Sequence, residues 1–247
     1  MNLILLGGFA SLLAGLATGI GALAVFFVRQ VSDRFLDAAL GFAAGIMLAA
    51  TSFSLIIPAI QYGGVVRTCV GILLGMVFLI CAERYIPHLH TVAGLKGRST
   101  HLDWLALFIL AITIHNFPEG LAVGVGFGGG DTRHGTILAI GIALQNIPEG
   151  MAVAFPLLRE KATRARAFLV ALLTGLVEPV GGLLGISAVS FGRVLLPYGL
   201  AFAAGAMLFV VSEEIIPETH SRGNARIATI GLMIGFVIMM VLETSLG

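Results

Sequence analysis

Charged side chains are scarce in this sequence: Asp, Glu, Lys and Arg together make up 11% of its 247 residues. Soluble domains carry about 25%, so the composition excludes a soluble protein. The formal net charge of +1 gives no indication of nucleic-acid binding. Cysteine is scarce as well. Cys69 and Cys81 fall in one apolar run, about 18 Å apart along a helix, which is too far for a disulfide bond.

Apolar residues dominate instead, at 58% of the chain with a mean hydropathy of +1.03. A helix that crosses a membrane needs about 20 consecutive apolar residues. Such runs fall near residues 3–28, 36–60, 65–86, 104–127, 135–158, 167–191, 194–217 and 227–246. We therefore predict an all-α integral membrane protein with eight transmembrane helices and a single domain covering 1–247. No basic residue precedes Arg29, so the first run is not expected to be a secretory signal.

Basic residues indicate how these helices are oriented. Eleven of the fourteen Lys and Arg residues lie at one set of alternating loops, after the first, third, fifth and seventh apolar runs, and three lie at the other set. Cytoplasmic loops carry the excess of Lys and Arg. We therefore expect both termini to lie outside the cytoplasm.

The first three helices are repeated by the last three at a constant offset of 160 residues. Phe42–Leu48 matches Phe202–Leu208 at six of seven positions, and Gly15 matches Gly175. Because three helices is an odd number and two more separate the halves, the repeat is inverted, in a 3+2+3 arrangement. Inverted repeats of this kind are typical of secondary transporters. Chance similarity of glycine-rich helices is the alternative.

The central pair of helices, about 104–158, carries one motif twice. Residues 115–123 read His-Asn-Phe-Pro-Glu-Gly-Leu-Ala-Val, and residues 145–153 read Gln-Asn-Ile-Pro-Glu-Gly-Met-Ala-Val. In each copy the first residue and the glutamate are i,i+4 and share a helix face. Pro118 and Pro148 supply no N–H, so each leaves a helix carbonyl free. Glu178 reaches a similar depth in the next helix, where the repeat places Thr18.

These residues offer one imidazole, three carboxylates and three amides. Such mixed nitrogen and oxygen donors without thiolate suit Zn²⁺, Fe²⁺, Mn²⁺ or Cd²⁺ rather than Cu⁺. The charge of three carboxylates, −3, favours more than one ion, and two divalent cations would more than offset it. A polar network that only holds the helices together is one alternative, and a membrane-embedded metal-dependent hydrolase using His115 and Glu119 is another.

The paired motif resembles that of the ZIP (Zrt/Irt-like) divalent metal transporters, especially their bacterial GufA-type branch. The resemblance extends over essentially the whole chain, including the eight helices and the inverted repeat. It implies a multi-pass protein of a bacterial inner membrane that takes Zn²⁺ into the cytoplasm, with the related ions Cd²⁺, Fe²⁺, Mn²⁺ and Co²⁺ as further candidate substrates. It makes a homodimer plausible. We expect a secondary transporter, not an enzyme, working by alternating access; a channel-like path through the same site is the alternative.

The resemblance also implies the ligands of a binuclear site. One metal would be held by His115, Glu119, Gln145 and Glu149, with Met47 nearby. The second would be held by Asn116, Asn146 and Glu178, with Glu119 and Glu149 bridging the two ions. Met47 has Met207 as its repeat equivalent, so packing is as good an explanation as ligation. Gln145 replaces a histidine found in many members, and Asn146 an aspartate found in some.

Further residues resemble the ends of the transport path. Ser54 resembles a position at the outer entrance. On the cytoplasmic side the candidates for metal release are Glu214, Glu218, His220, His88 and His90. We expect Glu214 and Glu218 to share a helix face, and no chemistry in the outer turn formed by Asp131, Arg133 and His134.

Overall fold

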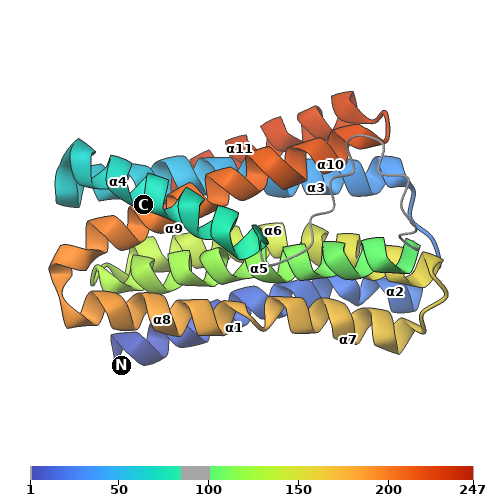
Figure 1. The fold of residues 1–247 in the computed structure, drawn as a ribbon, viewed down its shortest axis with the longest axis horizontal. Coiled ribbons are helices and arrows are strands. Elements are labelled where there is room, and N and C mark those ends of the chain that lie inside the picture. Colours follow the sequence, from blue (N-terminus) through green and yellow to red (C-terminus); the bar gives the residue numbers. More distant parts are fainter. Residues whose placement is uncertain (1, 85–100, 247) are drawn as a thin grey trace.

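The computed structural model describes residues 2–84 and 101–246, and these form helices with short connections (Figure 1). The α-helices are α1 Leu3–Ala22, α2 Ala24–Phe27, α3 Asp33–Ala49, α4 Ile57–Arg84, α5 His101–Gly128, α6 Thr132–Arg159, α7 Arg164–Gly175, α8 Glu178–Phe191, α9 Leu196–Val210, α10 Ile216–Ser221 and α11 Ala225–Leu246. Two π-helical segments, η1 Ala50–Ile56 and η3 Val211–Ile215, and a 3₁₀ turn, η2 Arg193–Leu195, join them. The all-α class is confirmed.

Seven helical segments of the described residues are long and apolar enough to cross a membrane, where eight were expected. The difference arises because the second and third expected runs form one stretch, Asp33–Ala82, of 50 residues. At 1.5 Å per residue it would extend about 75 Å, well over the ~30 Å of a bilayer core. Gly64, with φ of 76°, interrupts the helical geometry inside it. Figure 1 shows the chain reversing its direction within α4.

The helices lie in layers, with α5 and α6 in the middle (Figure 1). One outer layer contains α3, α4, α9 and α11, in which α3 packs on α11 and α4 on α9. The other contains α1, α7 and α8, in which α1 packs on α6 and α8 packs on α5. The two central helices, which carry the repeated motif, therefore contact both outer layers.

Residues separated by 160 positions make equivalent contacts in the first of these layers. The Cβ that Gly75 lacks would collide with the carbonyl of Phe202, and the one that Gly235 lacks would collide with the carbonyl of Phe42. Each member of the first pair is the repeat equivalent of the corresponding member of the second. Small residues let helix backbones approach closely in membranes, and Gly75 and Gly235 allow such an approach here.

Ion pairs tie the helix ends together on one side of the molecule. Asp37 of α3 is fully buried, and its carboxylate accepts hydrogen bonds from Arg222 at 2.7 Å and from Asn224 at 2.8 Å. Arg159, at the end of α6, pairs with Asp33 at 2.5 Å, but both of these side chains are 44% exposed. The carboxylate of the first pair thus lies in the packed interior, whereas the second pair lies on the surface.

Candidate metal-binding site

The polar residues of the motif pair are buried inside the protein, among helices that are otherwise mostly apolar. Buried to at least 95% are His115, Asn116, Glu119, Gln145, Asn146, Glu149 and Glu178. They project from α5, α6 and the start of α8. The structure therefore buries all seven residues that the motif pair and the repeat singled out.

The glycine of each motif explains how the three helices come so close. A Cβ on Gly120 would collide with the backbone of Glu178, and a Cβ on Gly150 would collide with the backbone of Thr18. Thr18 and Glu178 are repeat equivalents. The two motif copies therefore pack in the same way, α6 against α1 and α5 against α8. Only the contact of α5 with α8 involves a residue with a carboxylate, Glu178.

Glu178 lies at a break between two helices. The α7 helix ends at Gly175 and α8 begins at Glu178, followed at once by Pro179. Proline has no N–H and its ring clashes with the carbonyl four residues earlier, which stops a helix from continuing through this point. Asn146 fixes the carboxylate: its Nδ2 donates to Glu178 Oε1 at 2.6 Å and to the carbonyl of Ala14 at 2.8 Å.

Most polar atoms of the site make no hydrogen bond of normal geometry. Buried and without such a partner are both amide atoms of Asn116, both of Gln145, both oxygens of Glu119, Asn146 Oδ1, Glu149 Oε1 and Glu178 Oε2. A buried polar group without a partner costs about 1–3 kcal/mol, and a charged one costs more. Such a concentration of unpaired oxygens is unfavourable for a structural network and favourable for binding a cation.

The carboxylates are also near one another. Glu149 and Glu178 lie close enough to Glu119 for their charges to repel it, and the Gln145 amide approaches Glu119. Among the described residues, however, no three His, Cys, Asp or Glu side chains stand close enough together to hold one metal ion. Metal binding therefore needs amide or carbonyl oxygens as ligands, or rotation of the glutamates toward a shared ion.

His115 contacts a residue from outside the motif pair. Its Nε2 faces Oε1 of Glu214, in η3, across a short contact. The His115 side chain is 6% exposed and that of Glu214 is 26% exposed, so the pair leads from the buried site toward the surface. Glu214 is the repeat equivalent of Ser54. Of the expected release residues that the structure describes, Glu214 is the one in contact with the site.

The two other release candidates among the described residues, Glu218 and His220, have partners away from the site. Glu218 pairs with Arg222, next to the buried Asp37. His220 donates through Nδ1 to the carbonyl of Ile216, four residues earlier in the chain, at 2.7 Å. Glu214 and Glu218 thus have different partners, His115 and Arg222. His88 and His90 lie outside the described residues.

Met47 and Ser54 come from α3 and η1. Met47 is fully buried in the same apolar core as Met207, its repeat equivalent. Ser54 is fully buried, and its hydroxyl has no hydrogen-bond partner. Its backbone carbonyl lies 2.9 Å from Nε2 of His134, in the turn where no chemistry was expected. The proline four residues after Ser54, Pro58, was the available sequence signal for an unusual carbonyl there.

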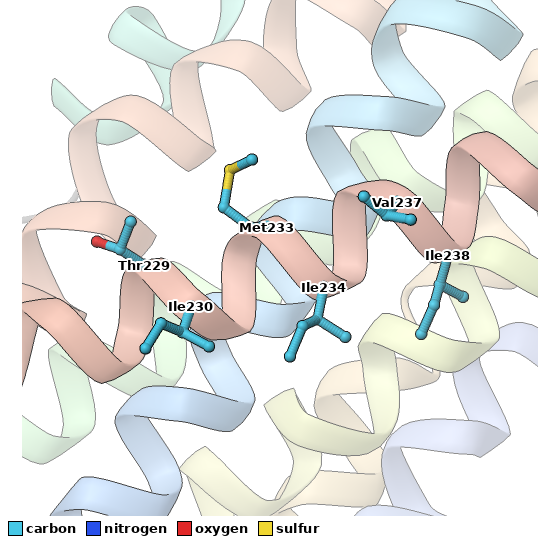
Figure 2. A pocket seen from close by; sticks show the side chains of 6 residues that line it. All are labelled: Thr229, Ile230, Met233, Ile234, Val237 and Ile238. Atoms are coloured by element: carbon cyan, nitrogen blue, oxygen red, sulfur yellow. The ribbon is translucent and has the colours of Figure 1, made fainter.

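A surface groove on α11 offers no metal site. Its lining consists of Thr229, Ile230, Met233, Ile234, Val237 and Ile238. Figure 2 shows these six side chains along one helix, with a single hydroxyl among hydrocarbon groups and one thioether. Hard divalent cations require several oxygen or nitrogen ligands, and this groove offers a single hydroxyl.

Comparison with known families agrees with the motif. The family model described as ZIP zinc transporter matches residues 99–243, the segment that contains both motif copies and Glu178. This chain belongs to the ZIP family. It is 47% identical to the zinc transporter GufA of Myxococcus xanthus, over 98% of this chain and 99% of that protein. The ZIP relatives also include zinc transporter ZIPB of Bordetella bronchiseptica, 43% identical over 98% of this chain and 81% of that protein.

The similarity reaches beyond bacteria. Human zinc transporter ZIP11 is 36% identical, over 93% of this chain and 94% of its own length. All three matches therefore extend across the helices on either side of the motif pair. The chain is of the GufA type within the family.

Proposed function

We propose that this ZIP protein carries divalent transition-metal ions, Zn²⁺ first among them, across the membrane into the cytoplasm. The ions would occupy a binuclear site formed by α5, α6 and α8, with Met47 of α3 at its edge. Its ligands are those named above, with Glu119 and Glu149 bridging the two ions. Cd²⁺, Fe²⁺, Mn²⁺ and Co²⁺ have the same ligand chemistry and are the candidates for additional substrates.

The single observation that carries this proposal is the set of buried polar atoms without partners on the repeated motif. Three glutamates in a low-dielectric interior repel one another. Divalent cations offset that repulsion and satisfy the unpaired oxygens at the same time. Because amides and shared carboxylates are weak ligands, the site suits an ion that must leave again.

The membrane arrangement belongs to the same proposal. Counting the stretch that contains Gly64 as two crossings gives eight helices in the 3+2+3 order, and the reversal of the chain in Figure 1 supports this count. The distribution of Lys and Arg supports termini outside the cytoplasm of a bacterial inner membrane. A homodimer is part of the proposal, and light scattering of the purified protein in detergent tests it.

The site-bearing helices α5 and α6 would move relative to the layer formed by α3, α4, α9 and α11, exposing the site to each side in turn. The membrane potential supplies about 2.3 kcal/mol per charge per 100 mV, hence roughly twice that for a divalent ion. On this proposal, the ion leaves the site toward the cytoplasm by first passing from His115 to Glu214, which are in contact.

Uptake of ⁶⁵Zn²⁺ into proteoliposomes tests the function, with wild type compared with Glu119→Ala and Glu149→Ala. We expect saturable uptake by wild type and none above background in either variant. Glu213→Ala is the matched control, because Glu213 is an exposed carboxylate. Unchanged uptake in both motif variants would overturn the site, and uptake that rises linearly with Zn²⁺ concentration would replace the carrier by a channel.

A further inference from the structure

A second contact of the site-bearing helices lies far from the motif pair, in the first turn of α6. Nε2 of His134 is 2.9 Å from the backbone oxygen of Ser54, a residue 80 positions earlier in η1. A carbonyl oxygen can only accept a hydrogen bond. Nε2 therefore carries the proton, and His134 donates to Ser54.

The acceptor is available because of the local sequence. In an α-helix the carbonyl of Ser54 would accept from the N–H of residue 58, but residue 58 is proline and has none. The chain around Ser54 is π-helical instead, and π-helical turns are frequent at functional sites. Ser54 is fully buried, so a hydrogen bond to its carbonyl removes the free-energy cost of leaving that buried oxygen unpaired.

A third element, α11, also lies beside the imidazole of His134. Glu243 of α11 places Oε1 3.9 Å from the same Nε2, which is too long for a hydrogen bond but close enough to favour that orientation of the ring. The side chains of His134 and Glu243 are 19% and 12% exposed. Glu243 Oε2 and Ser54 Oγ are buried without partners. His134 is thus enclosed by η1 and α11 at one end of the molecule.

The position of His134 means that this contact joins the site-bearing helix to the outer layer. It lies on the same unbroken helix as Gln145 and Glu149, about 17–22 Å along its axis, while η1 and α11 belong to the outer layer. At the repeat-equivalent position in the other half, Glu214 of η3 contacts His115. Each of the two π-helical segments is therefore held to the α5–α6 pair by one histidine.

We propose that His134 is a latch that keeps the entrance side of the pathway closed in this conformation. Its bond to Ser54 joins α6 to η1, and opening of the entrance requires that bond to break. This inference rests on the proposed function, because it assumes that α5 and α6 move relative to the outer layer. It assigns His134 a positioning role at the gate and no part in binding the metal.

The test measures access to residue 54 without any metal. Ser54→Cys is introduced into a Cys69→Ser, Cys81→Ser background, which keeps the carbonyl that His134 binds. The protein in proteoliposomes is then labelled with a membrane-impermeant maleimide from the entrance side. We expect slow labelling with His134 present and a labelling rate roughly two- to tenfold higher in His134→Ala, as for the loss of one hydrogen bond.

Two further variants separate the latch from simple crowding. His134→Phe keeps a ring of similar size but has no N–H, so we expect the same increase as in His134→Ala. Arg133→Ala changes the exposed neighbour in the same turn and is expected to leave the rate unchanged. An increase in His134→Ala without one in His134→Phe would overturn the latch, as would unchanged labelling in both folded variants. Since no Zn²⁺ is present, failure of the proposed transport would be seen separately, in wild-type uptake.

Discussion

Gly15 and Gly175 stand at equivalent positions of the repeat, and each lies against the backbone carbonyl of the other. A Cβ on either glycine would overlap the partner's carbonyl oxygen, so the α1 and α7 backbones are in direct contact at this point. Glu178 follows three residues after Gly175 and begins α8. The crossing of the two glycines therefore sets where the Glu178 carboxylate enters the site.

The first prediction concerns this crossing. Gly175→Ala is expected to lower stability by about 1–3 kcal/mol, because the extra methyl group forces two tightly packed backbones apart. Thermal unfolding in detergent measures the change. Gly192→Ala is the control, since a Cβ there would meet nothing within 4 Å, and its melting temperature should match that of wild type. Equal melting temperatures for all three proteins would contradict the close contact.

The second prediction concerns Asn146, the residue that orients Glu178. Asn146→Asp removes the N–H donor and places a second carboxylate beside Glu178 Oε1. We expect a metal-free protein that is less stable by about 1–3 kcal/mol, and a larger rise in melting temperature on addition of Zn²⁺ than wild type gives. Asn146→Ala loses the donor without adding charge, so it should be destabilised without the larger Zn²⁺ effect. A smaller rise in Asn146→Asp than in wild type would argue against a cation beside Glu178.

The third prediction separates two adjacent carboxylates of η3. Glu214 contacts His115, whereas Glu213 is exposed. Glu214→Gln should slow ⁶⁵Zn²⁺ uptake by about tenfold, as expected for the loss of roughly 1.4 kcal/mol of charge-assisted interaction. Glu213→Gln should transport at the wild-type rate. If both variants transport normally, the path does not pass His115 and Glu214.

The fourth prediction compares two arginines. Arg222→Ala leaves the fully buried Asp37 without its cation, and we expect a loss of about 3–5 kcal/mol. Arg159→Ala breaks a pair with two half-exposed members, for which about 0–1 kcal/mol is expected. Chemical unfolding followed by circular dichroism checks both. The test is which variant loses more free energy of unfolding. A loss in Arg159→Ala as large as that in Arg222→Ala would mean that burial does not determine how much each ion pair contributes to stability.

Much of the fold was available from local sequence. Hydropathy alone predicts a helical membrane protein, because every backbone polar group in lipid must be satisfied within its own segment. Residues that the offset of 160 relates, such as Gly75 and Gly235, make equivalent contacts in the structure. The expected runs 36–60 and 65–86 were divided beside Gly64, where the helical geometry of the structure is interrupted although no charged loop marks the place.

For the site, the sequence determined which residues are buried, since a polar residue in the middle of a long apolar run has no route to water. The tertiary structure alone decided how they face: Glu178 at a helix break held by Asn146, His115 turned to Glu214, and His134 on the carbonyl of Ser54. These pairs are separated by 32, 99 and 80 residues. Helical periodicity relates only neighbours a few positions apart, so such contacts follow from packing of whole helices and not from any local pattern.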